Sequence, residues 1–322
     1  MPFLRLILLC ICILTTCTTS AEGLLSMQWR IFNKILDRFD TVDYDTTYMA
    51  NPSKLWGVGT KLEVFASQTN FDGDSTLNVE ISPKANLKLT AQYRYLSLSI
   101  STFKFGSKRD FSFDFDMSGR VWGFDFIYDK SSKGDTPQLK DVDIKKTTID
   151  VNAYYVLFNK KFCYSATRGG SMEQRRTAGS PLFGISYYYY DINIADTAVQ
   201  STFKIKEVEV NNGGISAGYG INIVLGKKKQ WLLHISAMPT LTFISKNRMI
   251  PTDDAADGDY KSHNEWYSSQ VLIPIRSSIV FHHKHIYSSL YSFINLSNTT
   301  YGEEHTASNF DAHFSFSLGW MW

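Results

Sequence analysis

Residues 310–322, FDAHFSFSLGWMW, alternate between two kinds of side chain. One set is apolar and comprises Phe310, Ala312, Phe314, Phe316, Leu318, Trp320 and Trp322. The other set is polar or small and comprises Asp311, His313, Ser315, Ser317 and Gly319. A period of two places the sets on opposite faces of a β-strand. Exposing so much aromatic surface to water costs free energy, so the sequence predicts a strand whose apolar face is covered.

The same alternation recurs upstream, so one such strand is not an isolated feature. The clearest repeats are residues 111–117, 149–157, 213–225, 231–243 and 271–281. After Ser118-Gly119 the aromatic residues change phase, which predicts a β-bulge or a tight turn. Pro239 and Pro274 interrupt two of the repeats and predict irregular pairing there, because proline lacks a backbone donor. Glycines at 214, 218 and 220 share one face, which would let another element approach closely.

Composition excludes several classes of protein without selecting a function. The chain has 322 residues, 33 basic and 31 acidic side chains, and 43% hydrophobic residues. It is therefore neither a disordered nor a collagen-like chain, and it lacks the basic excess of nucleic-acid-binding proteins. Beyond the N-terminus, no apolar run reaches the length of a membrane-spanning helix.

The N-terminal 21 residues predict an exported protein. Arg5 precedes an apolar run from Leu6 to Leu14, and small polar residues follow up to Ala21. This is the order of a secretory signal peptide, with cleavage expected after Ala21. Lipidation of Cys17 is an alternative, although Thr16 is bulky for the preceding position. After cleavage Cys163 would be the single cysteine, so no internal disulfide is expected.

Together, export and alternating strands predict an all-β antiparallel transmembrane barrel. Aromatic residues end the chain, as in the C-terminal strand that bacterial outer-membrane proteins present to their assembly machinery, and this strand resembles it. Strand-end tryptophans fit the aromatic belts of membrane interfaces. The residues expected at the membrane interface or in the C-terminal assembly signal are Trp56, Trp231, Phe314, Phe316, Trp320 and Trp322.

We expect three regions: a signal peptide (1–21), a periplasmic lead-in (22–55) and the barrel (56–322). In the lead-in, residues 26–39 predict a short amphipathic helix, which could pack on the barrel mouth, lie on the membrane or enter the lumen. The barrel would have about ten strands, with twelve as the alternative. The ten are 56–68, 87–105, 110–130, 147–158, 179–194, 207–225, 231–246, 266–282, 285–297 and 309–322. Short connections, including 106–110, are assigned to the periplasmic side.

The same phase assignment gives a set of polar residues that face the lumen. They are Lys61, Glu63, Lys88, Arg94, Asp114, Asp116, Asp150, Arg276, Asp311 and His313. Both signs of charge are present, whereas a selective pore would show a ring of one sign. We therefore expect a lumen filled by mutually neutralising charges rather than an open channel.

The sequence indicates no specific catalytic reaction, and we predict no cofactor and no metal. Asp311 and His313 share a face, but spacing along one strand does not make a catalytic triad. His282, His283 and His285 could bind a transition metal, yet successive positions point to opposite faces and no accompanying motif is present. Neither a Walker phosphate loop nor a paired Cys-x-x-Cys motif occurs.

Several motifs resemble a known family. They are Tyr44-Asp45-Thr46-Thr47-Tyr48, residues 154–166, Arg175 to Ser180, and Ser216 to Gly220 followed by Trp231-Leu232-Leu233. They are similar to domain-of-unknown-function family 4421. Its members are exported Bacteroidota proteins regarded as outer-membrane barrels. The resemblance implies fold and location and leaves activity open.

Three functional hypotheses follow from the sequence. The first is an outer-membrane barrel with a structural, binding or small-solute transport role. The alternatives are a barrel-embedded surface hydrolase and a secreted soluble β-protein. The expected partners of the first are outer-membrane lipid and the barrel-assembly machinery, with no nucleic acid.

Overall fold

The structure is a computed structural model, and it divides into two compact units, Met1–Thr41 and Val42–Trp322. It describes residues 22–40, 43–50, 54–72, 77–105, 111–131, 143–168, 172–195, 200, 205–226, 228–251, 260–261, 271–301 and 305–322. The predicted signal peptide and the lipidation alternative at Cys17 lie outside these residues.

The first unit contains one helix, α2 (Glu22–Asp40), which includes the helix predicted over 26–39. Apolar residues recur every three or four positions, so they form one stripe along the helix. Trp29 and Phe32 lie on this stripe with ring centroids 5.5 Å apart. Within the described residues, no helix is both long and apolar enough to cross a membrane.

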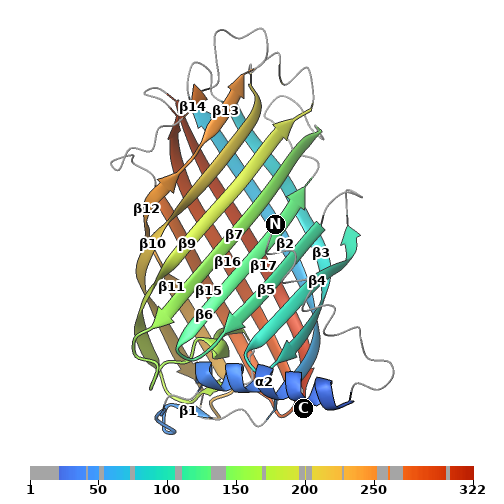
Figure 1. Cartoon of the computed structure of the whole chain (residues 1–322), viewed down its shortest axis with the longest axis vertical. Helices are drawn as coiled ribbons and strands as arrows, with labels where there is room; N and C mark the ends of the chain where they lie inside the picture. Colours follow the sequence, from blue (N-terminus) through green and yellow to red (C-terminus); the bar gives the residue numbers. More distant parts are fainter. Residues whose placement is uncertain are drawn as a thin grey trace. The chain divides into compact units, whose positions relative to one another are not determined.

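The second unit is a closed antiparallel β-barrel (Figure 1). Its strands are β2 (Trp56–Asp72), β3 (Leu77–Tyr93), β4 (Leu96–Phe105), β5 (Phe111–Ser118), β6 (Trp122–Ser131), β7 (Ile144–Val156), β9 (Ala178–Ile194), β10 (Ile205–Leu225), β11 (Trp231–Ala237), β12 (Thr240–Ser245), β13 (Arg248–Pro251), β15 (Val271–His283), β16 (Ile286–Tyr301) and β17 (His305–Met321). The first and last strands, β2 and β17, pair with each other. On the remaining side β11 and the first two residues of β12 join β10 to β15, which closes the barrel.

β11, β12 and β13 follow one another along β10 and form a single interrupted strand. The barrel therefore has twelve strands, which confirms the twelve-strand alternative and shows that the count of ten is wrong. A two-residue ribbon, β14 (Tyr260–Lys261), pairs with β13 beside this wall. The interruption lies at Met238-Pro239, as predicted for proline. Pro274 pairs regularly with β16 on one side, but its pairing with the interrupted strand breaks between Leu272 and Ile275.

The wrong count has a local cause. Segments 87–105 and 110–130 each read as one strand, but each contains a tight connection, at Arg94-Tyr95 and at Gly119 to Val121. We call the barrel end with these connections, Trp56 and Met321 the terminal end, and the opposite end the loop end. Because of the turn at Arg94, the end of β4 at Phe105 and the start of β5 at Phe111 lie at the loop end. Residues 106–110, predicted as a connection on the side of the termini, lie outside the described residues.

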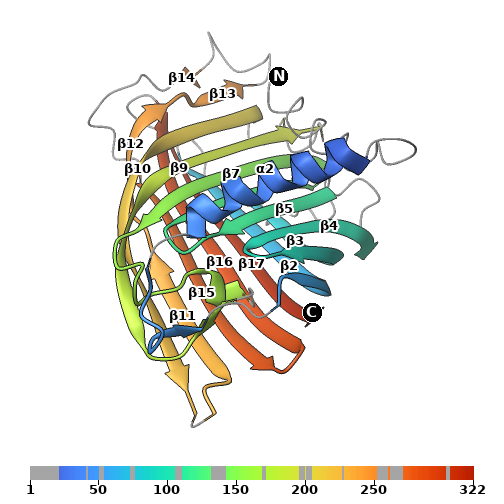
Figure 2. The same ribbon diagram turned by 60° about the horizontal axis from the view of Figure 1, so that its bottom comes forward.

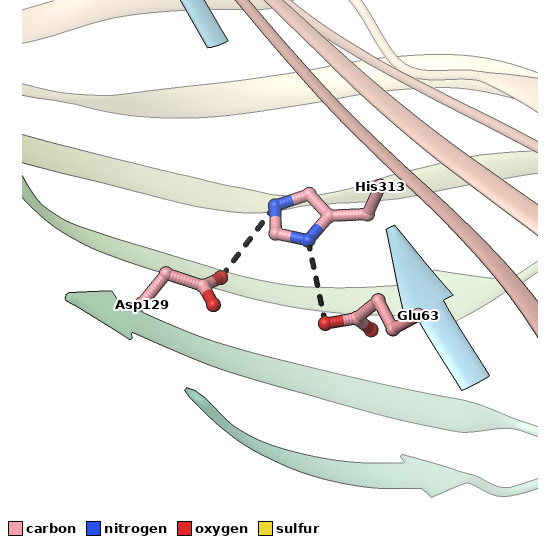
Figure 3. A group of neighbouring side chains, drawn as sticks. All are labelled: Glu63, Asp129 and His313. Atoms are coloured by element: carbon pink, nitrogen blue, oxygen red, sulfur yellow. Dashed lines mark ion pairs between the residues drawn. The ribbon is translucent and has the colours of Figure 1, made fainter. Parts of the chain in front are cut away.

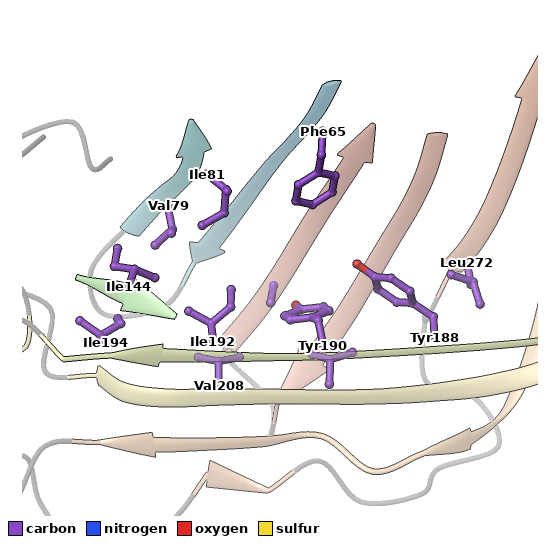
Figure 4. Packing of buried hydrophobic residues seen from close by; sticks show 12 residues of the cluster. Phe65, Val79, Ile81, Ile144, Tyr188, Tyr190, Ile192, Ile194, Val208 and Leu272 are labelled. Atoms are coloured by element: carbon purple, nitrogen blue, oxygen red, sulfur yellow. The ribbon is translucent and has the colours of Figure 1, made fainter. Parts of the chain in front are cut away.

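The apolar and polar side chains exchange faces along the length of the barrel. Near the terminal end the outer wall is apolar, as at Phe183 and Ile185 of β9, and the lumen is polar. Near the loop end β9 turns Asp191 outward and buries Ile192 inside. The buried apolar cluster at this end comprises Phe65, Val79, Ile81, Ile144, Tyr188, Tyr190, Ile192, Ile194, Val208, Val210, Leu272 and Ala307 (Figure 4). The loop-end half is thus built like a water-soluble barrel.

Two tyrosines lie over glycines of the neighbouring strand. Tyr154 pairs with Gly123, and Tyr287 pairs with Gly319. A Cβ atom on either glycine would overlap the tyrosine ring. Each glycine therefore creates the space in which an inward aromatic side chain lies flat on the wall.

We expect Gly123→Ala to destabilise the barrel by about 1–3 kcal/mol, the usual cost of overpacking. The reason is that the Tyr154 ring must leave its site among buried neighbours. Urea-induced unfolding of the refolded protein measures the change. Gly57→Ala is the matched control, since its Cβ would meet the flexible Met321 side chain at 3.3 Å. Equal unfolding midpoints for the two variants would contradict this interpretation.

Candidate functional site in the barrel lumen

A re-entrant segment fills the terminal end of the lumen. Its described residues, 157–168 and 172–177, lie between β7 and β9 and include the short helix η1 (Ser165–Arg168). Figure 2 looks toward this end. The residues from Phe162 to Thr167 are buried, although they belong to a connection. The ring of Phe162 lies over Gly220, where a Cβ would come within 3.2 Å of it, so the predicted glycine face accommodates this segment.

Arg168 fixes the re-entrant segment to the barrel wall. Its guanidinium lies 3.0 Å from carboxylate oxygens of Asp116 and of Asp125, and it donates to the Tyr291 hydroxyl at 2.9 Å. Arg276 of β15 approaches the other Asp125 oxygen at 2.7 Å. Burial alone would lower the pKa of Arg168, but Asp116 and Asp125 outweigh burial and raise that pKa well above its ordinary value. The guanidinium therefore stays charged and joins the segment to β5, β6 and β16.

The chain before β2 closes over the same end. Strand β1 (Met49–Ala50) pairs with β8 (Glu173–Gln174) of the re-entrant segment. The Gln174 amide donates to the carbonyl oxygens of Lys161, Tyr48 and Arg176, and its oxygen accepts from the Cys163 backbone N–H at 2.9 Å. This one side chain thus connects the lead-in to the segment inside the barrel.

Asp45 forms a local turn within the lead-in. Its Oδ1 accepts from the Thr47 hydroxyl at 2.6 Å and from the Thr47 backbone N–H at 2.9 Å, and these bonds lower the pKa of Asp45. Because its pKa is lowered in the folded protein, the ionised Asp45 carboxylate stabilises the fold at pH values above its ordinary pKa of about 4. This stabilisation is lost as the pH falls through the lowered pKa.

We therefore expect Asp45→Ala to increase hydrogen exchange at the Tyr48 and Met49 amides, which both donate to the Asp45 carbonyl. The difference in exchange rate between the variant and the unmodified protein should be largest near pH 6 and should shrink as the pH falls below about 4. Site-resolved exchange measured across this range provides the test. A difference that is independent of pH would contradict the role of the carboxylate.

Deeper in the lumen lies a cluster of six ionisable side chains. The Lys88 ammonium lies 2.5 Å from both Glu63 and Asp114, and Lys61 lies 2.9 Å and 2.6 Å from the same two carboxylates. His313 stands between two further oxygens: Nδ1 is 3.9 Å from Glu63, and Nε2 is 3.7 Å from Asp129 (Figure 3). With His313 protonated, three positive charges balance three negative ones.

This charge balance bears on metal binding. Ligand atoms of Glu63, Asp129 and His313 lie within 4.8 Å of one another, close enough to share an ion. However, Lys61 and Lys88 already neutralise Glu63, and the two imidazole nitrogens face different carboxylates. A divalent ion would add positive charge to a buried cluster that is neutral with an imidazolium, so the geometry fits an ion-pair network better.

A second network joins opposite walls. Lys146 of β7 contacts Asp311 of β17 at 2.9 Å, Ser67 of β2 at 2.5 Å and Asn309 of β17 at 2.8 Å. The Tyr188 hydroxyl also donates to Asp311. Since β7 and β17 are six strands apart around a twelve-strand barrel, these side chains cross the whole lumen.

The sequence-predicted lumen residues separate into groups. Lys61, Glu63, Lys88, Asp114 and His313 lie together in the cluster, whereas Asp311 pairs with Lys146 instead of His313. Asp116 and Arg276 belong to the Arg168 network, and Asp150 accepts from Asn152 and Asn295. Arg94 lies in the β3–β4 turn and not on a strand wall.

Sequence reasoning missed several lumen residues. The outward aromatics of β6 imply that Asp125 and Asp129 face inward, so the phase change could have revealed them. Lys146 falls one residue before the predicted strand, and Arg168 falls within a presumed periplasmic connection, so neither gave a usable signal.

Beside Arg168 is a cavity of about 60 Å³. Seryl and threonyl hydroxyls dominate its lining, together with the Lys61 and Asp114 side chains. The cavity lies next to the cluster and allows water to solvate one side of Lys61.

The residues predicted for the membrane interface lie on the outer wall. Trp56, Trp231, Trp320 and Trp322 are 43–53% exposed and lie at the terminal end, as does Trp122. Phe314 and Phe316 point outward from β17. Among the histidines near the β15–β16 turn, Nδ1 of His283 contacts Gln230 and that of His285 contacts the Met321 carbonyl, so they do not converge.

Solved structures with a similar chain path are bacterial outer-membrane proteins. The outer membrane protease OmpT from Escherichia coli is 8% identical, with a TM-score of 0.43, covering 84% of this chain and 98% of its own. The P. putida toluene transporter TodX is 9% identical, with a TM-score of 0.29 and coverages of 84% and 91%. OprG from Pseudomonas aeruginosa is 12% identical, with a TM-score of 0.25 and coverages of 84% and 97%.

No curated protein sequence matches this chain. A family model does match, over residues 43–320, which include the lead-in strand β1, the re-entrant segment and all of the barrel except its last residues. The chain therefore belongs to the family described as a domain of unknown function, DUF4421.

Proposed function

We propose that this protein is an outer-membrane β-barrel with a closed lumen, and that its role is structural or binding rather than conducting. The observation that carries the proposal is the contact between Lys146 and Asp311 from opposite walls. An eight-strand barrel fills its interior with ordinary side chains, and a porin of 16 or more strands leaves a channel. In a barrel of intermediate width, lysine and arginine side chains are long enough to span the space.

The outer wall supports the membrane location. From Trp56 to Ala66 the outward residues of β2 include Val58, Leu62 and Val64, and amide side chains follow at Gln68 and Asn70. These eleven residues equal the roughly 9–11 that a transmembrane strand needs. A soluble barrel would leave this band in water, which disfavours a secreted soluble protein. We infer export by the predicted signal peptide, with the terminal end periplasmic, and insertion by the barrel-assembly machinery.

The buried cluster does not favour a hydrolase. Only 5% of the His313 side chain is exposed, and each nitrogen faces a carboxylate, so a substrate could reach it only after the network opens. Among the described residues, charge pairing explains His313 and Asp311 without a catalytic role.

Conductance in planar bilayers tests the closed lumen. We expect the refolded protein to give no steady single-channel current, while heat-modifiable migration on a denaturing gel shows that the same sample contains folded barrel. A stable, ion-selective current from the folded protein would refute the closed lumen. Recovery in the soluble fraction without heat-modifiable migration would refute the membrane location.

A further inference from the structure

Two basic turns lie side by side at the terminal end. The β10–β11 turn carries Lys228 and Lys229, and the β15–β16 turn carries Lys284. They are neighbours because β11 pairs with β15. Gln230 connects them: its carbonyl accepts from the His282 backbone N–H at 3.0 Å, and its amide nitrogen lies 2.8 Å from His283 Nδ1. The three lysines are exposed and belong to these two neighbouring turns.

The backbone of these turns is unfavourable for lysine. Among the described residues, the non-glycine residues with positive φ are Arg94 (55°), Lys229 (55°) and Lys284 (53°). Glycine or asparagine adopts this conformation at lower cost than other side chains. All three residues are basic, and all three occupy turns at the terminal end. Such strain is expected where the side chain contributes something that a better turn residue would not.

The outer wall next to the turns is apolar. Trp231 packs on Phe281 with ring centroids 4.7 Å apart, and the two belong to paired strands. Trp320 stacks on His285 at 5.2 Å. Since tryptophan marks the level of lipid headgroups in membrane proteins, the adjacent lysine ammonium groups would reach the lipid phosphates.

We propose that the paired turns bind the headgroup of an anionic phospholipid, with Lys228, Lys229 and Lys284 at the phosphate and Trp231, Phe281 and Trp320 against the acyl chains. The inference rests on the proposed membrane location. The net positive charge of the two turns selects the lipid class, because the turn sequences GKKKQ and HHKHI contain no acidic residue. A zwitterionic headgroup would bring its own positively charged amine into this cationic site, whereas an anionic headgroup would not.

The test is the double variant Lys229→Asn/Lys284→Asn in the full-length barrel. Asparagine removes the charge and suits positive φ, so the turns themselves should be at least as stable. The protein is refolded into phosphatidylcholine vesicles that contain brominated phosphatidylglycerol, and quenching of tryptophan fluorescence gives the relative binding constant. At about fivefold per basic residue near an anionic surface, we expect a loss of about twenty-fivefold for the two residues.

Lys130→Asn/Lys145→Asn is the matched control. Both lysines are exposed near the loop end, so this variant loses the same charge elsewhere and should keep the preference for phosphatidylglycerol. Lys229→Arg/Lys284→Arg should also keep it. An unchanged binding constant in the asparagine variant would overturn the proposal. It would also be overturned if inorganic phosphate stabilised the detergent-solubilised protein as much as phosphatidylglycerol does, because the ligand would then be a soluble anion.

Heat-modifiable migration in the vesicles separates the two levels of inference. If the unmodified protein fails to insert, the proposed membrane location is wrong. If it inserts and the asparagine variant retains its preference for phosphatidylglycerol, the barrel location stands and the lipid site is wrong.

Discussion

Lys88→Met should destabilise the barrel by about 3–5 kcal/mol, the usual effect of removing one partner from a buried ion pair. The Lys88 side chain is fully buried, and its ammonium lies 2.5 Å from both Glu63 and Asp114. Methionine retains most of the apolar stem but leaves one excess negative charge in the cluster. Urea-induced unfolding in detergent micelles measures the loss.

Two further variants separate charge from packing. Lys130→Met removes an exposed lysine from β6 and should shift the unfolding midpoint little. Lys88→Met/Asp114→Asn restores the original charge balance, so it should recover part of the stability. If the double variant is no more stable than Lys88→Met, lost packing and not the unpaired charge explains the effect.

Arg168→Met should release the re-entrant segment while the barrel remains folded. The variant loses three contacts, to Asp116, Asp125 and Tyr291, and Arg276 still holds Asp125. Cys163 reports the release because it lies in the same segment and is fully buried. A local loss of about 3 kcal/mol would accelerate its alkylation roughly a hundredfold.

Peptide mass spectrometry after timed alkylation gives the rate at Cys163 alone. Arg175→Met is the matched control, because Arg175 is exposed on the same segment and its removal should leave the rate unchanged. Retained heat-modifiable migration shows that the barrel persists. A variant that alkylates as slowly as the unmodified protein would mean that apolar packing around Phe162, and not Arg168, holds the segment.

The sequence located strands well where the alternation was complete. In β17 the outward Phe314 and Phe316 and the inward Asp311 and His313 follow from period two and the cost of wetting aromatic rings. The predicted break at Pro239 was likewise local, because a missing backbone donor needs no tertiary information.

Turns were harder to locate. Arg94 occupies a positive-φ position where glycine or asparagine would have indicated a turn, so β3 and β4 read as one strand. Once that turn was missed, the strand ends at Phe105 and Phe111 were assigned to the wrong barrel end. A basic residue at a positive-φ position, the feature that Arg94 shares with Lys229 and Lys284 of the proposed lipid site, thus concealed the hairpin.

By itself the sequence determined the strand period, the family resemblance and the presence of both charge signs on the inward faces, because each depends on neighbours in the chain. Tertiary structure alone decided that Lys146 meets Asp311, that Arg168 enters the lumen, and that the faces exchange chemistry near the loop end. Alternation distinguishes two faces but does not decide which face is apolar, and here the outer face is apolar in one half of the barrel and polar in the other. Partners on opposite walls are set by barrel closure, which no single strand encodes.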